Sequence, residues 1–228
     1  MARRALRPGN DLSMLVPLAG LVLQHVRQLD FLPVATLGLL GVNAFIFLGT
    51  VGRRVEPYCI SAAKLLRGDS WRVLYTNTFV HADQMHLYYN SLSFLHKATQ
   101  LEGALGTAHL LLLIALCCAL TPAYYILLEV VGARLLPALI STRDCAVGFS
   151  GVIFALKVIC QHLFPQDGSV MGITMPSHLL AWGELVAISL VTPNASFVGH
   201  LAGILAGLTV VLLGVAGKRR QGGRRNVF

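Results

Sequence analysis

Charged residues are scarce in this chain of 228 residues, because aspartate, glutamate, lysine and arginine together make up only 12% of it. Soluble globular domains carry roughly a quarter of charged residues. Hydrophobic residues make up 55% of the chain, and its mean hydropathy is +0.69. This composition excludes a soluble protein and indicates an integral membrane protein, with a length that allows one compact domain.

Acidic residues are especially few. The chain has 10 aspartates and glutamates against 18 lysines and arginines, which gives a net charge of +8. Basic clusters can bind nucleic acid, but beside membrane spans they more often mark cytosolic ends. We therefore expect contact with the lipid bilayer and no nucleic-acid partner. Much of the basic excess lies at the two ends of the chain, as Arg3, Arg4 and Arg7, then Lys218, Arg219, Arg220, Arg224 and Arg225.

The cysteines lack the spacing of a metal site. There are five of them, at Cys59, Cys117, Cys118, Cys145 and Cys160, and no set of them matches a zinc motif. We expect neither a metal ion nor another cofactor. Cys59 and Cys145 are expected on the outer side of the membrane, where a disulfide can form. Cys117 and Cys118 are interpreted as apolar packing residues.

Six segments are apolar enough to be candidate membrane spans, for which about 20 apolar residues are needed. The second of them is weakly apolar and the fifth is short. The sequence predicts an all-α bundle of six transmembrane helices over residues 31–217, between an N-terminal segment, 1–30, and a basic cytosolic tail, 218–228. The six segments are Phe31–Val51, His86–Gly106, Ala108–Val131, Ala146–Phe164, Ser177–Val191 and Phe197–Gly217.

The apolar stretch Met14–Val26 is too short to span a bilayer by itself. It either lies at the membrane interface or extends the first helix. No small-residue cleavage site follows it, so we expect no cleaved signal peptide. Six spans put both termini on one side, which the basic ends assign to the cytosol. The loop from Gly52 to Met85 then lies on the outer side, although it carries five basic residues, Arg53, Arg54, Lys64, Arg67 and Arg72.

Polar residues occur near the outer ends of the second, fourth and sixth spans, which run in the same direction. His86 and Asn90 begin the second span, Ser150 lies near the start of the fourth, and His200 near the start of the sixth. At 1.5 Å rise per residue, these four side chains fall within roughly 10 Å of one membrane face. Three helices therefore bring polar groups to one depth, which predicts a functional site.

Glycines surround two of these residues. Gly199, Gly203 and Gly207 form a small-xxx-small pattern around His200, which allows close helix packing in lipid. The expected neighbour is the fourth span, in which Gly151 and Ala155 are also four residues apart.

Gly148 and Gly151 remove side chains around Ser150. We expect the serine hydroxyl to approach a neighbouring helix there and backbone amides to stay open at a helix N-terminus, where anions bind readily. A nucleophile, a base and oxyanion donors are what acyl transfer requires.

Five motifs give the chain a resemblance to the rhomboid intramembrane serine proteases, and more closely to the rhomboids of the eukaryotic endoplasmic reticulum. "GFSG" at 148–151 matches the nucleophile motif of that family. "GHLAGILAG" at 199–207 matches the motif of its last helix, and "HADQMHLYYN" at 81–90 that of its second helix. "WR" at 71–72 and "LEGALG" at 101–106 match the first loop and the end of the second helix.

The resemblance covers about Phe31 to Gly217 and implies a role for each residue of the predicted site. Ser150 would be the nucleophile, His200 the base, and His86 and Asn90 oxyanion donors. It implies cleavage of transmembrane protein substrates by a Ser–His dyad, in protein quality control or regulated release. It also implies a multi-pass protein of the endoplasmic reticulum membrane; the arginine-rich start leaves the mitochondrial inner membrane as the alternative.

The sequence departs from the family pattern in three places. Ala104 stands where many rhomboids have arginine, which places a structural ion pair with Glu102 in doubt. Phe154 stands where bacterial members often have a tyrosine under the histidine ring, so an aromatic face is kept. The resemblance also implies partners in ubiquitin-dependent degradation, but the chain stops at Phe228 without the tail that would bind them.

Two other functions compete with proteolysis. A rhomboid-like pseudoprotease would bind or escort transmembrane clients, but such relatives typically lack the serine or histidine that this chain keeps at 150 and 200. A small transporter would need charges near the bilayer midplane. Lys157 and Glu184 are the only hints of that kind, and we favour a structural role for both.

Overall fold

Helices dominate the computed structural model, which describes residues 12–51, 53–68, 71–138, 140–142, 145–192 and 195–217. The basic clusters predicted at the two ends of the chain lie outside these residues. One short antiparallel hairpin, β1–β2, pairs Gly168–Val170 with Ile173–Met175. The helices are α1 (Leu15–Val26), α2 (Val34–Thr50), η1 (Glu56–Tyr58), α3 (Ala62–Leu66), α4 (Val73–Phe79), α5 (Gln84–Leu105), α6 (Thr107–Leu135), α7 (Ser150–Leu163), η2 (Ser177–Leu179), α8 (Leu180–Val191) and α9 (Phe197–Leu212).

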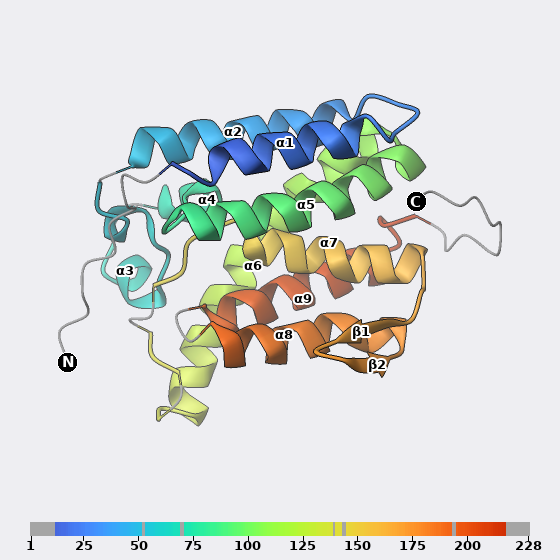
Figure 1. The fold of residues 1–228 in the computed structure, drawn as a ribbon. Coiled ribbons are helices and arrows are strands. Elements are labelled where there is room, and N and C mark those ends of the chain that lie inside the picture. The colour runs from blue at the N-terminus through green and yellow to red at the C-terminus, as the bar shows by residue number, and fades with distance from the viewer. Residues whose placement is uncertain are drawn as a thin grey trace.

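Helix α7 is the central element of the bundle. It packs against α5 on one side and α9 on the other, with α8 beside α9 and with α6 running obliquely behind them (Figure 1). Ten consecutive residues, Gly151–Cys160, are buried. A helix that is buried on every side is apolar on every side. The burial of α7 therefore explains why the fourth predicted span is a nearly continuous hydrophobic run.

The predicted spans correspond to α2, α5, α6, α7, α8 and α9, with different ends. Among the described residues, α6 is the one helix whose length and apolar composition suffice to cross a membrane. Helix α7 begins at Ser150 instead of Ala146, because Ala146 pairs with Ile60 in a β-bridge and Gly148 has a φ of 111°. Helix α9 ends at Leu212, five residues early, and a turn follows it.

Helix α1 ends at Val26 and α2 begins only at Val34, so Met14–Val26 does not extend the first predicted span. The alternative, that it lies at the membrane interface, stays a prediction. The Met14 amide donates to Gln84 Oε1 at the first residue of α5 (3.3 Å). His25 Nε2 lies 3.0 Å from Thr99 Oγ1, four turns further along α5. The segment from α1 to the start of α2 therefore follows α5 for most of its length, and α1 and α2 each pack against α5 (Figure 1).

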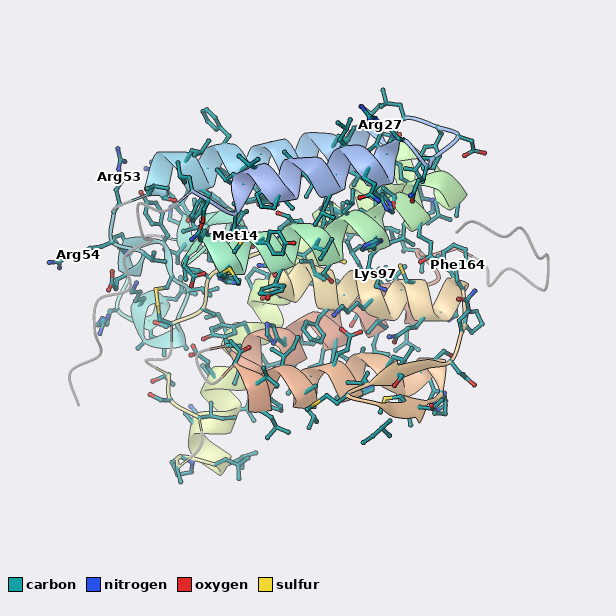
Figure 2. All side chains as sticks on the ribbon, in the orientation of Figure 1. Met14, Arg27, Arg53, Arg54, Lys97 and Phe164 are labelled. Carbon is teal, nitrogen blue, oxygen red and sulfur yellow. A yellow bond between two sulfur atoms is a disulfide. The ribbon has the colours of Figure 1, made fainter. Side chains whose placement is uncertain are left out.

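The two ends of the described chain lie at opposite ends of α5. Met14 lies at its first residue, whereas near the other end of the chain the Val215 carbonyl accepts from His109 Nε2 (2.8 Å), just beyond the last residue of α5. Figure 2 shows Met14 toward the end of the bundle where Arg53 lies, with Arg27 at the other end. The termini themselves lie outside the described residues, so the expectation that both lie on one side of the membrane stays a prediction.

The buried carboxylate of Glu102 holds three helices together. It accepts hydrogen bonds from the Ala35 and Thr36 amides in the first turn of α2 (2.8 and 2.9 Å) and from the hydroxyls of Thr36 and Thr107 (2.7 and 2.8 Å). Amides in a first helical turn have no partner within the helix, and a carboxylate there also interacts favourably with the helix dipole. These four donors satisfy Glu102 without the arginine that Ala104 replaces.

Candidate active site

Ser150 and His200 are brought together by the first turns of two adjacent helices. Ser150 is the first residue of α7, and His200 is the fourth residue of α9. The Ser196 hydroxyl caps α9 by accepting from the Gly199 amide (3.0 Å), which fixes where that first turn begins. Ser150 Oγ and His200 Nε2 are 3.0 Å apart, within hydrogen-bond distance.

Glycine contacts make this approach of α7 and α9 sterically feasible. A Cβ atom on Gly203 would lie 2.1 Å from the Gly151 carbonyl oxygen, and one on Gly207 would lie 2.6 Å from that of Ala155. Distances this short show that the two backbones touch. The glycine pattern of the sixth span thus packs on the partner that the sequence predicted, Gly151 and Ala155.

His86 and Asn90 lie on the other side of Ser150, in the first two turns of α5. Asp83 caps this helix by accepting from the His86 amide (2.8 Å). A Cβ atom on Gly148 would lie 2.5 Å from His86 Cε1 and 3.5 Å from Asn90 Nδ2. The side of Gly148 without a side chain therefore faces both predicted oxyanion donors, and the φ of 111° at this residue is one that glycine adopts readily.

Within the ranges that the structure describes, hydrogen-bond donors on both α5 and α7 lack partners beside Ser150. Asn90 Nδ2 is buried and has no hydrogen-bond partner among the described residues. Helix α7 has no side-chain cap at its N-terminus, where the first amides lack partners within the helix. An oxygen that carries negative charge and lies between α5 and α7 would meet donors from both helices.

Phe154 packs against one face of the His200 ring. Its ring stacks on the His200 imidazole, with 4.6 Å between the ring centroids and 25° between the planes. Both side chains are buried. The aromatic face that the sequence keeps at this position is therefore in contact with the ring of His200.

His81 is a buried residue of this region to which the sequence analysis assigned no role. Its ring lies 5.2 Å from that of His86, edge to face, and its Nδ1 donates to the Phe79 carbonyl (3.2 Å). Burial first, and the neighbouring His86 second, lower the pKa of His81 well below its usual value despite that hydrogen bond. The ring is therefore neutral at pH 7. The sequence feature that could have indicated a role is its position in the motif HADQMHLYYN, five residues before His86.

The segment that leads into Ser150 is held in place by a disulfide, a β-bridge and a backbone hydrogen bond. Cys145 forms a disulfide with Cys59, so the sulfur pairing that the sequence left open is present. Ala146 exchanges both backbone hydrogen bonds with Ile60 (3.0 and 3.1 Å), and the Gly148 amide donates to the Asn77 carbonyl (2.8 Å). These contacts hold the glycine that faces His86 and set the start of α7.

The lysine of the fourth predicted span and the glutamate of the fifth form an ion pair. Lys157 Nζ, on α7, contacts Glu184 Oε2, on α8. The ammonium also lies 4.6 Å from the centroid of the Phe154 ring. The pair is thus one aromatic ring away from His200.

The mainly helical bundle and the apolar composition are those of an α-helical membrane protein. Residues 67–217 match the Rhomboid domain. The chain belongs to the rhomboid family, in its eukaryotic type.

Named relatives agree with this assignment. The chain is 41% identical to rhomboid-related protein 4 of Mus musculus over 191 residues, which are 82% of this chain and 60% of the relative. It is 39% identical to rhomboid-related protein 4 of Homo sapiens over 178 residues, 78% of this chain and 56% of that protein. It is 30% identical to the Arabidopsis thaliana protein named rhomboid-like protein 14, mitochondrial, over 210 residues, 88% of this chain and 62% of the relative. The chain thus spans about 60% of the length of these relatives.

Proposed function

We propose that this chain is an intramembrane serine endopeptidase that cleaves transmembrane or membrane-proximal segments of other membrane proteins. The observation that supports this most directly is the 3.0 Å contact between Ser150 Oγ and His200 Nε2. A nucleophile within hydrogen-bond reach of a base is the arrangement that acyl transfer needs. Gly148 carries no side chain where His86 and Asn90 approach it, which brings both donors next to the backbone that leads into Ser150.

In the first half of the reaction, His200 Nε2 takes the proton of the Ser150 hydroxyl as the oxygen attacks the scissile carbonyl. The tetrahedral intermediate places its negative oxygen near Asn90, His86 and the first amides of α7. One such donor contributes about 3–4 kcal/mol of transition-state stabilisation in other acyl-transfer enzymes. The imidazolium of His200 then protonates the leaving amine, and the peptide bond breaks.

In the second half, a water molecule gives a proton to His200 and attacks the acyl group on Ser150. The imidazolium then returns this proton to Ser150 Oγ as the ester bond breaks and the carboxylic acid product leaves. For Nε2 to accept protons, the neutral ring must carry its proton on Nδ1. His200 Nδ1 is buried and has no hydrogen-bond partner among the described residues. The proposed mechanism is therefore that of a dyad, without a carboxylate behind the histidine.

We further propose six spans, α2 and α5 to α9 without the short η2, and a multi-pass protein of the endoplasmic reticulum membrane that acts in protein quality control or regulated release. The Cys59–Cys145 disulfide lies close to the site end of the bundle, and disulfides form in an oxidising compartment such as the lumen of the endoplasmic reticulum. The mitochondrial inner membrane is the alternative, and one relative is named mitochondrial.

The test is cleavage of a transmembrane reporter by purified protein in liposomes. Ser150→Ala and His200→Ala should each abolish cleavage, and the double variant should be little worse than either single one, because the two residues act as a unit. Asn90→Ala should retain measurable turnover, since other oxyanion donors remain. Labelling with a serine-reactive fluorophosphonate should be lost in Ser150→Ala.

Ser169→Ala serves as the matched control, because Ser169 is an exposed residue of β1, which follows the end of α7 opposite to Ser150. This variant should keep wild-type cleavage and labelling. All variants are compared as monodisperse proteins in detergent. Cleavage that survives in Ser150→Ala would reject the mechanism and favour a non-catalytic binder of transmembrane clients.

A further inference from the structure

Lys157 and Glu184 are ionisable side chains within the bundle that the proposed mechanism does not use. Lys157 lies two turns along α7 from Ser150 and is buried, and its ammonium pairs with Glu184 of α8, which is 30% exposed. Charges are costly within a membrane protein and persist where they are paired and useful. A bond between two helices is one use, and the surroundings of the ammonium indicate a second.

The Lys157 ammonium lies over the ring that supports the general base. It is 4.6 Å from the centroid of Phe154, within the distance of a cation–π interaction. The same ring stacks on His200 with 4.6 Å between centroids. Glu184, Lys157, Phe154 and His200 thus form a continuous series of contacts that ends at the proposed base.

This series supplies an orientation that the dyad otherwise lacks. In hydrolases with a catalytic triad, a carboxylate bonded to Nδ1 holds the histidine ring in place. His200 Nδ1 has no such partner in the described part of the chain, and the stack on Phe154 constrains the plane of its ring. A cation over Phe154 restrains that ring, and therefore the direction in which Nε2 points toward Ser150.

We propose that Lys157, held by Glu184, is a positioning residue that orients His200 through Phe154. Glu184 has a second effect, because it neutralises an ammonium that would otherwise oppose the positive charge formed on His200 during the reaction. The inference rests on the proposed Ser150–His200 chemistry.

The first test replaces the ion pair by neutral side chains in Lys157→Met/Glu184→Gln, which leaves neither charge without its partner. We expect kcat for the transmembrane reporter to fall about tenfold with little change in KM, since Lys157 lies two turns along α7 from Ser150 and acts on the base. Lys157→Arg keeps a cation that binds aromatic faces, and we expect it to keep most of the turnover. Arg27→Met is the control, an exposed basic residue at the end of the bundle opposite to Met14 (Figure 2), and should change kcat less than twofold.

The second test separates positioning from a simple bond between helices. The exchanged pair, Lys157→Glu/Glu184→Lys, keeps an ion pair between α7 and α8 but places a carboxylate beside Phe154. If positioning is the role, the exchanged protein should melt near the wild-type temperature and still show the tenfold loss of kcat. Because this variant keeps its ion pair, it carries the test even if the neutral pair fails to fold.

Two results would overturn the inference: wild-type kcat in the exchanged pair, or wild-type kcat in the folded neutral pair. Failure of the underlying function is distinguishable in the same assay. It would appear as cleavage that is absent from the wild type or that persists in Ser150→Ala. If the wild type cleaves the reporter and Ser150→Ala does not, then a wild-type kcat in the variants at positions 157 and 184 refutes the positioning role alone.

Discussion

Replacing Gly203 by alanine adds one methyl group where α7 and α9 touch. The new Cβ would lie 2.1 Å from the Gly151 carbonyl oxygen, whereas ordinary contacts begin at 3.4 Å. The backbones must then separate locally by about 1.3 Å, the difference between these distances. Overpacking of this kind costs about 1–3 kcal/mol. The better helix propensity of alanine returns at most about 1 kcal/mol, so the variant should be less stable.

The same displacement acts on the dyad, because Gly203 is one turn from His200 and Gly151 is next to Ser150. If it is transmitted in full, the 3.0 Å contact between Oγ and Nε2 lengthens to about 4.3 Å, beyond hydrogen-bond reach. A misplacement of about 1 Å can cost about 100-fold in rate. We therefore expect Gly203→Ala to lose most of its cleavage and fluorophosphonate labelling.

The matched control is Gly41→Ala, on the exposed side of α2, where a Cβ would meet nothing within 4 Å. This variant should be as stable as the wild type or slightly more so, with full activity. Thermal unfolding in detergent and labelling rate are measured on both proteins, and each kcal/mol corresponds to about 2–4 °C for a chain of this size. A Gly203→Ala protein with wild-type melting temperature and labelling would refute the close packing of α7 and α9.

Two further predictions concern the outer loop and the N-terminal helix. Cys59→Ser/Cys145→Ser should lower the free energy of unfolding by about 2–4 kcal/mol and slow fluorophosphonate labelling, since Cys145 begins the segment that leads into Ser150. A reductant should have the same effects on the wild type and no effect on the variant. Equal melting temperatures of the wild type and the variant would contradict this prediction. Six spans put both termini in the cytosol, so a glycosylation acceptor near Gly68 should be modified in microsomes, whereas acceptors before Leu12 and after Phe228 should not. Modification of the N-terminal acceptor would contradict six spans and show that α1, which lies along α5, also crosses.

Much of the candidate site follows from local features of the sequence. Composition indicates a membrane protein because the bilayer excludes charge over a whole segment. The positions of His86, Ser150 and His200 within their apolar runs predict one common depth, because the rise of a helix per residue is constant. The glycine spacing at 203 and 207 predicts which face packs closely, since this depends on helical periodicity alone.

The path of α1 was decided by tertiary contacts. By length and hydropathy, Met14–Val26 is too short for a span, and those properties do not reveal that His25 reaches Thr99 on another helix. Likewise, Glu102 at the end of an apolar run predicts neither the α2 amides nor Thr107 as its partners. Such pairings join residues far apart in the chain, so no local pattern contains them.

The sequence by itself determined the class of the protein, the helical segments and the residues that share a depth, because each depends on neighbours within a few turns of the same helix. Only the tertiary structure decided which side chains meet across helices. It paired Cys145 with Cys59 and placed Lys157 between Glu184 and the ring that supports His200. The physical reason is that these contacts depend on the rotation of each helix about its axis, which the packing of all its neighbours sets together.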